Sequence, residues 1–336
     1  MRIGGVKYLL VLSSLGLWGC SCSSEPNLPV APLASQNSPA VVGQKPEKVG
    51  APHLPNAYRI HQKVISGGEP DGKAAFQELK DLGVKTVISV DGAQPDVKLA
   101  AEYGLKYVHL PHGYDGVPAE RGKELAKAVR DLPGPIYIHC HHGKHRSPAA
   151  ATVACVGAGL LAPADAVTVL KTAGTSENYR GLYESASEAL KLEAELLDNL
   201  KVDFRPTVEL PPMADSMVHI GHAYDHLKLL SENGWKPLPD HPDLDPPHEA
   251  LLLREQYTEL LRTPDVQRES KPFQDMLRAS EQDSIALETA LRTWKETGYM
   301  GTPPTALADS FGRVSKNCKA CHTDFRDVPL HEKGKK

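Results

Sequence analysis

The segment CKACH at residues 318–322 constrains this chain more than any other part of its sequence. The thiols of Cys318 and Cys321 are spaced so that both can add to the two vinyl groups of one porphyrin, and His322 is then held at the iron as an axial ligand. A chance pair of cysteines and half of a zinc site are the alternatives. A zinc site needs two further ligands nearby, and only His331 follows. The motif therefore predicts covalently bound haem c.

The N-terminal residues predict export, after which haem c is attached. Basic residues precede a short apolar stretch at 8–18, which has the length of a signal-peptide core and is too short to span a bilayer. Residues 17–20, Leu-Trp-Gly-Cys, resemble a bacterial lipobox, although tryptophan is unusual there. We expect residues 1–19 to be removed and Cys20 to be lipidated, with an ordinary signal peptide as the alternative. The protein is then periplasmic and held to the membrane by its lipid.

Length and composition predict two domains. The chain has 336 residues and a formal net charge of −4, which argues against a broad nucleic-acid surface. Residues 20–56 are rich in proline, alanine and serine without hydrophobic periodicity, so we expect a disordered tether. A proline-containing linker at 201–212 separates residues 57–200 from residues 213–328, and a basic tail occupies 329–336.

Both domains have recognisable patterns of secondary structure. The first alternates apolar strands with amphipathic helices, which predicts an α/β fold with a parallel-rich sheet covered by helices. The expected strands begin at Val64 and cover 84–90, 105–110 and 135–139; the expected helices cover 72–82, 95–103, 118–132, 146–161, 163–172 and 179–200. The second domain shows four helical segments, which predict an all-α antiparallel bundle that carries the haem. These segments are 213–233, 248–262, 271–297 and a last helix from Pro304.

A Cys-x5-Arg sequence follows the expected strand at 135–139 and leads into the next helix. Such a loop turns its backbone N–H groups inward, and together with the helix N-terminus they form an anion cradle that favours a thiolate at Cys140. Arg146 can hold two phosphate oxygens in a fork, and Gly143 permits a backbone angle that side chains resist. Cys140 is then the nucleophile that forms a phosphocysteine. The residues expected to bind phosphate are His141, His142, Gly143, Lys144, His145 and Arg146.

At these residues the first domain resembles the protein tyrosine and dual-specificity phosphatase superfamily. The match includes His139 before the cysteine, Gly143 within the loop and Ser147 after the arginine, and residues 66–70 (SGGEP) look like the opening of small bacterial members. The resemblance implies that the hydroxyl of Ser147 helps the thiolate to leave in the second step. A loop that binds phosphate without turnover is the alternative.

The resemblance also implies an aspartate that acts as general acid from a loop before the cysteine strand. Residues 114–118, Tyr-Asp-Gly-Val-Pro, resemble that loop and make Asp115 the candidate. It must protonate the leaving oxygen within hydrogen-bond reach, which closure of the loop would allow. Asp91 and Asp96 are the alternatives, and a simple turn residue is the plainer interpretation of Asp115.

Histidines crowd this region of the first domain, and they allow a second interpretation as a metal-dependent hydrolase. They are His109, His112, His139, His141, His142 and His145. Because the Cys-x5-Arg loop already explains the motif, we expect Lys144 and the loop histidines to add positive charge around the phosphate. A phosphoprotein, a phosphoinositide or a small phosphate ester all suit such a site, and the sequence does not choose among them.

The last expected helix resembles the final helix of the cytochrome c′ family over residues 311–326. This resemblance implies His322 as the axial ligand. Some relatives bind the other face of the iron through a methionine on the first helix, for which Met217 is the candidate. Met213, His219 and His222 are the alternatives. A vacant sixth position would allow a small gas to bind.

These predictions combine into one hypothesis and one competitor. The first is an exported lipoprotein that joins a cysteine-dependent phosphatase to a haem c domain for electron transfer or for redox or gas sensing. It requires a phosphorylated substrate, and an electron-transfer role requires a redox partner. The competitor is a non-catalytic anion-binding domain fused to an electron carrier or haem sensor.

Overall fold

The computed structural model describes residues 45–333. The expected signal peptide, Cys20, the first part of the tether and residues 334–336 of the tail lie outside the described residues.

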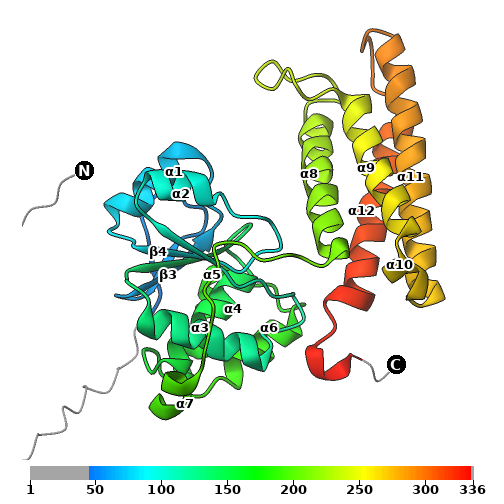
Figure 1. Cartoon of the computed structure of the whole chain (residues 1–336). Coiled ribbons are helices and arrows are strands. Elements are labelled where there is room, and N and C mark those ends of the chain that lie inside the picture. Colours follow the sequence, from blue (N-terminus) through cyan, green and yellow to red (C-terminus); the bar gives the residue numbers. More distant parts are fainter. Residues whose placement is uncertain (1–44, 334–336) are drawn as a thin grey trace, which may run out of the picture. The chain divides into compact units, whose positions relative to one another are not determined.

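A mixed sheet forms the centre of the first domain (Figure 1). Its strand order is β1-β2-β3-β6-β4-β5, in which the last four are mutually parallel and β1 and β2 add an antiparallel edge. The parallel-rich sheet predicted from the sequence is confirmed. The strands are β1 (Glu47–Lys48), β2 (Tyr58–His61), β3 (Val64–Gly68), β4 (Thr86–Ser89), β5 (Lys106–His109) and β6 (Ile136–Cys140).

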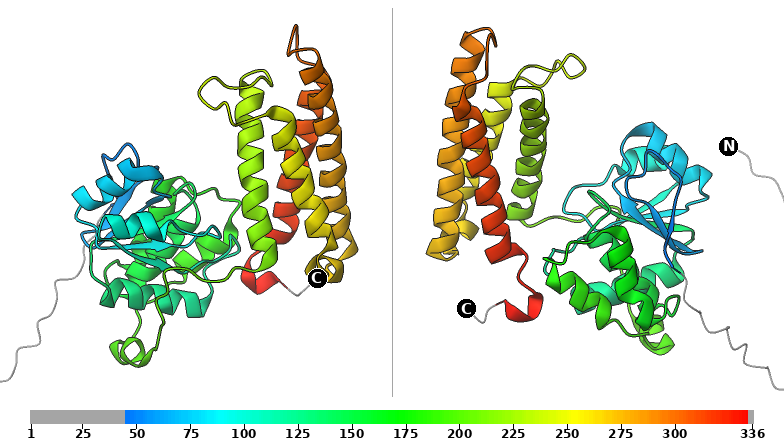
Figure 2. Two further views of the ribbon diagram at one scale, coloured as in Figure 1. Left: turned by 45° about the horizontal axis from the view of Figure 1, so that its top comes forward. Right: turned by 180° about the vertical axis from the view of Figure 1, so that it is seen from behind.

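Alternating side chains of the strands build a separate core on each face of this sheet, because successive residues of a strand point to opposite faces. Ile65, Val87 and Tyr137 pack with α1 (Gly72–Asp81) and α2 (Val97–Glu102). Their neighbours Val64, Ile88 and Ile138 pack with α3 to α6 on the other face (Figure 2). These helices and the short α7 are α3 (Ala119–Asp131), α4 (Arg146–Gly157), α5 (Ala166–Ala173), α6 (Arg180–Ser187) and α7 (Ala194–Asn199), with a 3-10 turn at Pro163–Asp165.

Two expectations about the limits of elements are wrong. The end of the expected tether is folded, because β1 pairs with β2 and Leu54 is buried in the core beside α1. The single helix expected at 179–200 is interrupted between α6 and α7. There the backbone N–H of Leu192 donates to the carbonyl of Gly157 at 3.0 Å, a bond to the end of α4 that a continuous helix would not allow.

The region after residue 211 consists of helices, as the sequence predicts (Figure 1). Each of the long helices packs against the next one along the chain, around a core that includes Leu227, Leu253, Leu291 and Val314. The helices are α8 (Pro212–Glu232), α9 (Pro246–Arg262), the short α10 (Pro264–Arg268), α11 (Lys271–Glu296) and α12 (Thr305–Cys321). A π-helical turn at His322–Arg326 and a 3-10 turn at Leu330–Glu332 follow.

Among residues 45–333, no helix is both long enough and apolar enough to cross a membrane.

Candidate active site

Loop 140–147 lies at the end of β6, which is paired on one side with β3 and on the other with β4. Cys140 is 2% exposed, and its Sγ lies 3.4 Å from the Oγ of Ser147. The hydroxyl of Ser147 in turn donates to the carbonyl of Gly67, 2.9 Å away. The two residues that the sequence assigned to nucleophile and leaving-group assistance are therefore brought together at the first turn of α4, whose N-terminus favours negative charge.

Close packing of glycines fixes the path of this loop. Gly143 has a φ of +70°, and a Cβ added to it would lie 2.3 Å from the backbone nitrogen of Gly68. Only glycine fits both the backbone angle and the space. The glycines in the SGGEP segment are thus the surface against which the loop packs, which gives a structural reason for that segment.

Side chains that the sequence analysis did not single out also hold the loop. The amide nitrogen of Asn56 donates to the carbonyls of Gly143 and Ala173, each at 2.9 Å. The hydroxyl of Thr175 donates to the carbonyl of Lys144 at 2.6 Å. No sequence signal marked Asn56, because it lies in the segment that its composition assigned to the tether.

Arg146 is 8% exposed, and its guanidinium is only partly satisfied. Its Nη2 donates to Oδ2 of Asp91 at 2.9 Å, and its Cζ lies 4.4 Å from the ring centre of Tyr114. Within residues 45–333, the buried Nε has no hydrogen-bond partner. A buried donor without an acceptor is costly, so the arrangement favours binding of an anion beside Arg146.

Two of the three loop histidines, His142 and His145, contribute less positive charge than we expected. Burial and the neighbouring His142 lower the pKa of His145 to about 4, and burial and His141 lower the pKa of His142. Both side chains are therefore predominantly neutral at pH 7. In contrast, the carboxylates of Asp225 and Glu69 raise the pKa of His141 to about 10, so His141 adds to the positive charge of Lys144 and Arg146 in loop 140–147. Among the described residues, no group of three or more His, Cys, Asp or Glu side chains is placed to hold a metal ion.

The structure separates the three candidate general acids. Asp91 contacts Arg146 directly, whereas the carboxylate of Asp96 accepts from the backbone N–H of Leu99 at 2.9 Å and caps α2. Asp115 lies in the loop after β5 and folds back on Gly113, where an added Cβ would lie 2.2 Å from its Oδ1. Among the described residues, no hydrogen bond or ion pair joins Asp115 to loop 140–147. Its Oδ2 instead accepts from Nζ of Lys333 at 2.6 Å.

The expected haem-binding cysteines lie at the end of α12. Cys318 and Cys321 are free, half-buried thiols that pack against the helical core. Burial raises the pKa of both thiols, to about 11 for Cys321. The hydroxyl of Tyr257 lies 3.3 Å from the Sγ of Cys318. Among residues 45–333, the ring of His322 makes no hydrogen bond or ion pair, so the donor set of two thiols and one imidazole fits a c-type haem.

Met217 is placed toward the same end of the helices as these cysteines. The hydroxyls of Tyr224 on α8 and Ser315 on α12 lie 2.9 Å apart, and the two helices run in opposite directions (Figure 1). About two helical turns before Tyr224 lies Met217, and about two turns after Ser315 lies His322. Met213 and Met217 both pack against the core, whereas His219 and His222 are exposed.

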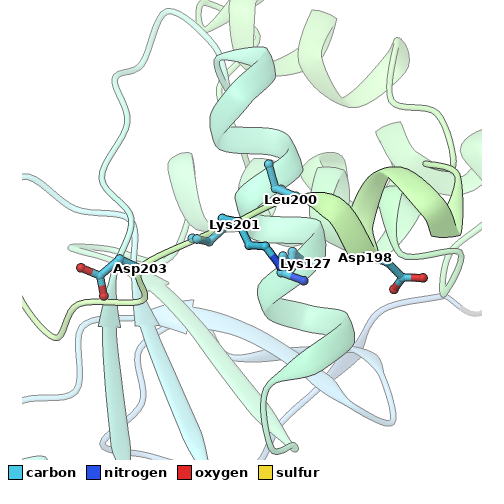
Figure 3. A pocket seen from close by; sticks show the side chains of 6 residues that line it. Lys127, Asp198, Leu200, Lys201 and Asp203 are labelled. Atoms are coloured by element: carbon cyan, nitrogen blue, oxygen red, sulfur yellow. The ribbon is translucent and has the colours of Figure 1, made fainter.

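A pocket elsewhere in the first domain contains none of these residues. It is formed where α3 meets the segment after α7, with Lys127 between Asp198 and Lys201 (Figure 3). Nζ of Lys127 is already bonded to Asp131 and to the carbonyl of Leu197, at 2.7 and 2.8 Å. The pocket offers neither a nucleophile nor an anion cradle.

Comparison with known proteins gives structural similarities only. No family model matches the sequence, and no curated protein matches it. The first domain resembles TpbA of P. aeruginosa, with 21% identity over 44% of this chain and 90% of that one and a TM-score of 0.37. A variant of TpbA in complex with pTyr gives 20% identity, 46% and 92% coverage and a TM-score of 0.38.

The core catalytic domain of the PP-IP phosphatase Siw14 from S. cerevisiae, in complex with citrate, is also similar. It shows 13% identity over 42% of this chain and 88% of that one, with a TM-score of 0.35. These solved structures are a protein that was solved in complex with pTyr and a PP-IP phosphatase. Each similarity covers less than half of this chain at low identity, so the function proposed next depends on the site itself.

Proposed function

We propose that the first domain hydrolyses phosphate monoesters through a phosphocysteine at Cys140. The observation that supports this most directly is the buried Nε of Arg146, which lacks an acceptor in the loop that carries the nucleophile. A phosphate group supplies acceptors for that N–H and for the backbone N–H groups of the loop. Phosphoproteins, phosphoinositides and small phosphate esters all remain substrates of the proposed class.

The proposed reaction has two steps. The thiolate of Cys140 attacks phosphorus, the ester P–O bond breaks, and the leaving oxygen takes a proton from Asp115 after its loop has closed. Water then attacks phosphorus, the S–P bond breaks and inorganic phosphate leaves. In that step the hydroxyl of Ser147 turns from the carbonyl of Gly67 to donate its hydrogen bond to the departing thiolate, while ionised Asp115 accepts a proton from the water.

Turnover of a chromogenic aryl phosphate tests this proposal. Wild-type protein, with Cys140 kept reduced, should release the phenol, and Cys140→Ser should abolish release while still binding tungstate, a phosphate analogue. Cys155→Ala is the control, because Cys155 is buried within α4 and outside the loop. Binding of tungstate without any turnover by the wild type would favour the non-catalytic, anion-binding alternative.

We further propose that the helical domain carries haem c, attached to Cys318 and Cys321 with His322 as an axial ligand and Met217 as the candidate for the opposite face. The half-buried thiols, the unpaired imidazole and the position of Met217 support this assignment. When bound, haem supplies one-electron redox chemistry, and it binds small gases where the opposite face is open. A role in electron transfer would require a redox partner.

On the N-terminal sequence alone, we propose that the protein is exported to the periplasm and anchored by lipid at Cys20. Wild-type protein should then partition with membranes, and Cys20→Ser should become soluble or stay uncleaved. Mature protein that begins at another residue and carries no acyl group would contradict this proposal.

A further inference from the structure

Asp91 is a buried carboxylate directly after β4, and all its acceptor positions face donors. It is 5% exposed. Its Oδ1 accepts from the backbone N–H groups of Gly92 and Ala93, at 2.6 and 3.3 Å. Its Oδ2 accepts from Nη2 of Arg146 at 2.9 Å and from the backbone N–H of His141. A single side chain thus joins the arginine to the first residue after the nucleophile.

We propose that Asp91 is a positioning residue of the phosphate site, which orients the guanidinium of Arg146 so that its Nε faces the bound phosphate. This inference rests on the proposed function. The pairing through Nη2 leaves Nε without a partner among the described residues, so one N–H of the arginine is held in place and another is kept for the substrate. Because the guanidinium is already oriented, less conformational entropy is lost when the phosphate binds.

Two other roles for Asp91 fit the contacts less well. A general acid must carry a proton at the working pH. Burial alone would raise the pKa of Asp91, but Arg146, His139 and the side chain and N–H of His141 together lower it, so the carboxyl is ionised. The other role is that of a carboxylate that occupies the phosphate site and is displaced by the substrate. Asp91 would then lose its four hydrogen-bond donors and leave the buried guanidinium of Arg146 without its ion pair, which is unfavourable.

The experiment measures tungstate binding calorimetrically in the Cys140→Ser protein, where turnover does not interfere. Asp91→Asn should weaken binding by about 10- to 100-fold, the range expected when a hydrogen bond to a charged group is lost. Asp91→Glu, which keeps the charge, should recover part of the loss. Asp96→Asn is the matched control, because the side chain of Asp96 caps α2. This variant should bind tungstate as tightly as the parent protein does.

A double-mutant cycle separates positioning from a general loss of structure. In an Arg146→Lys background the planar fork is already gone, so adding Asp91→Asn should change tungstate binding by less than about threefold. An equal loss in both backgrounds, or tighter binding by Asp91→Asn than by the parent, would overturn the proposal. Far-UV circular dichroism checks that each variant is folded. If Asp91→Asn is unfolded, the same double-mutant cycle with Asp91→Glu tests the proposal.

The pH profile of kcat distinguishes this inference from a catalytic role. Asp91→Asn should raise KM and keep the alkaline limb of the kcat profile, because the group that donates the proton is elsewhere. Loss of that limb would make Asp91 the acid and overturn the inference. If the wild type binds tungstate without turnover, the proposed hydrolysis fails while the binding cycle still tests Asp91; if it binds no tungstate, both proposals fail.

Discussion

The side-chain amide of Asn56 donates to the carbonyl of Gly143 at 2.9 Å, and so connects the start of the first domain to the middle of the phosphate loop. The same nitrogen reaches Ala173 at the end of α5. The carbonyl of Gly143 is thus held from outside the loop. The geometry of the site therefore depends on a residue far from it in sequence.

Asn56→Gly should weaken both stability and substrate binding. Asn56 has a φ of +51°, which glycine adopts easily, so the change removes the amide without straining the backbone. Loss of two hydrogen bonds should lower the free energy of unfolding by roughly 1–3 kcal/mol and raise KM for an aryl phosphate. Urea unfolding and steady-state kinetics measure these effects. Asn178→Gly, at an exposed position of the same domain, should leave KM unchanged; an equal rise in both variants would contradict the assigned role.

Asp115→Asn should slow the first chemical step by about 10²–10⁴-fold, the range typical of general acid catalysis. Because Asp115 makes no hydrogen bond or ion pair with loop 140–147 among the described residues, tungstate binding should stay within a factor of about two of the wild type. Single-turnover kinetics on an aryl phosphate with a poor leaving group measure the step. Full activity in Asp115→Asn would assign the proton transfer to another group.

Replacement of both Cys318 and Cys321 by serine should remove haem from the polypeptide. Haem held by thioether bonds stays with the chain in denaturing electrophoresis, so the wild type should show a haem stain and the double variant none. Cys155→Ala should stain like the wild type. Stain that persists in the double variant would show that the haem is not attached at these thiols.

Met217→Ala should change the absorption spectrum of the haem-loaded protein if its sulfur binds the iron. Loss of a thioether ligand lowers the reduction potential and opens a position for carbon monoxide. His219→Ala, which alters an exposed side chain two residues away, is the control and should keep the wild-type spectrum. Identical spectra and carbon monoxide binding in both variants and the wild type would remove Met217 from the ligand set.

Buried histidines should make the first domain sensitive to mild acid. Burial, with Arg146 nearby, lowers the pKa of His112 to about 4, and burial lowers that of His139 to about 4. In the unfolded chain these two histidines take up their protons near pH 6.5, whereas in the folded chain they do so only near pH 4. Stability that is present above pH 6.5 is therefore lost as pH falls from 6.5 towards 4, by roughly 3 kcal/mol for each histidine.

Urea unfolding at several pH values measures this loss. His112→Gln should give a shallower pH dependence than the wild type between pH 6.5 and 4, because glutamine takes up no proton. An unchanged slope would show that His112 is not responsible.

The sequence predicted the parallel strands and their helices because each has a clear period. Residues 84–90 (VKTVISV) are rich in β-branched residues, as a buried strand favours, and the helix 72–82 shows one apolar face. The β1–β2 edge was missed because its strands are short and polar. The break between α6 and α7 was missed because the contact of Leu192 with Gly157 is made in the folded structure only.

The sequence predicted those residues of the candidate site that lie close together in the chain, and it did not predict those that reach the site from distant segments. Cys140, Gly143, Arg146 and Ser147 lie within one loop, so their spacing alone indicates an anion cradle. Asn56 and Thr175 reach the loop from other parts of the chain, and no spacing rule connects them to it. Asp91 was considered as an acid, but only its contacts with Arg146 and His141 indicate that it positions the arginine.

The central place of β6 in the sheet also has a consequence for folding. Val64 pairs with Ile136, and Gly68 pairs with Cys140, so the nucleophile is packed only when two segments far apart in sequence have met. Such long-range parallel pairing is slow to form. Until it forms, the thiol of Cys140 is unprotected on an incompletely folded chain, and oxidation at that stage would compete with folding of the first domain.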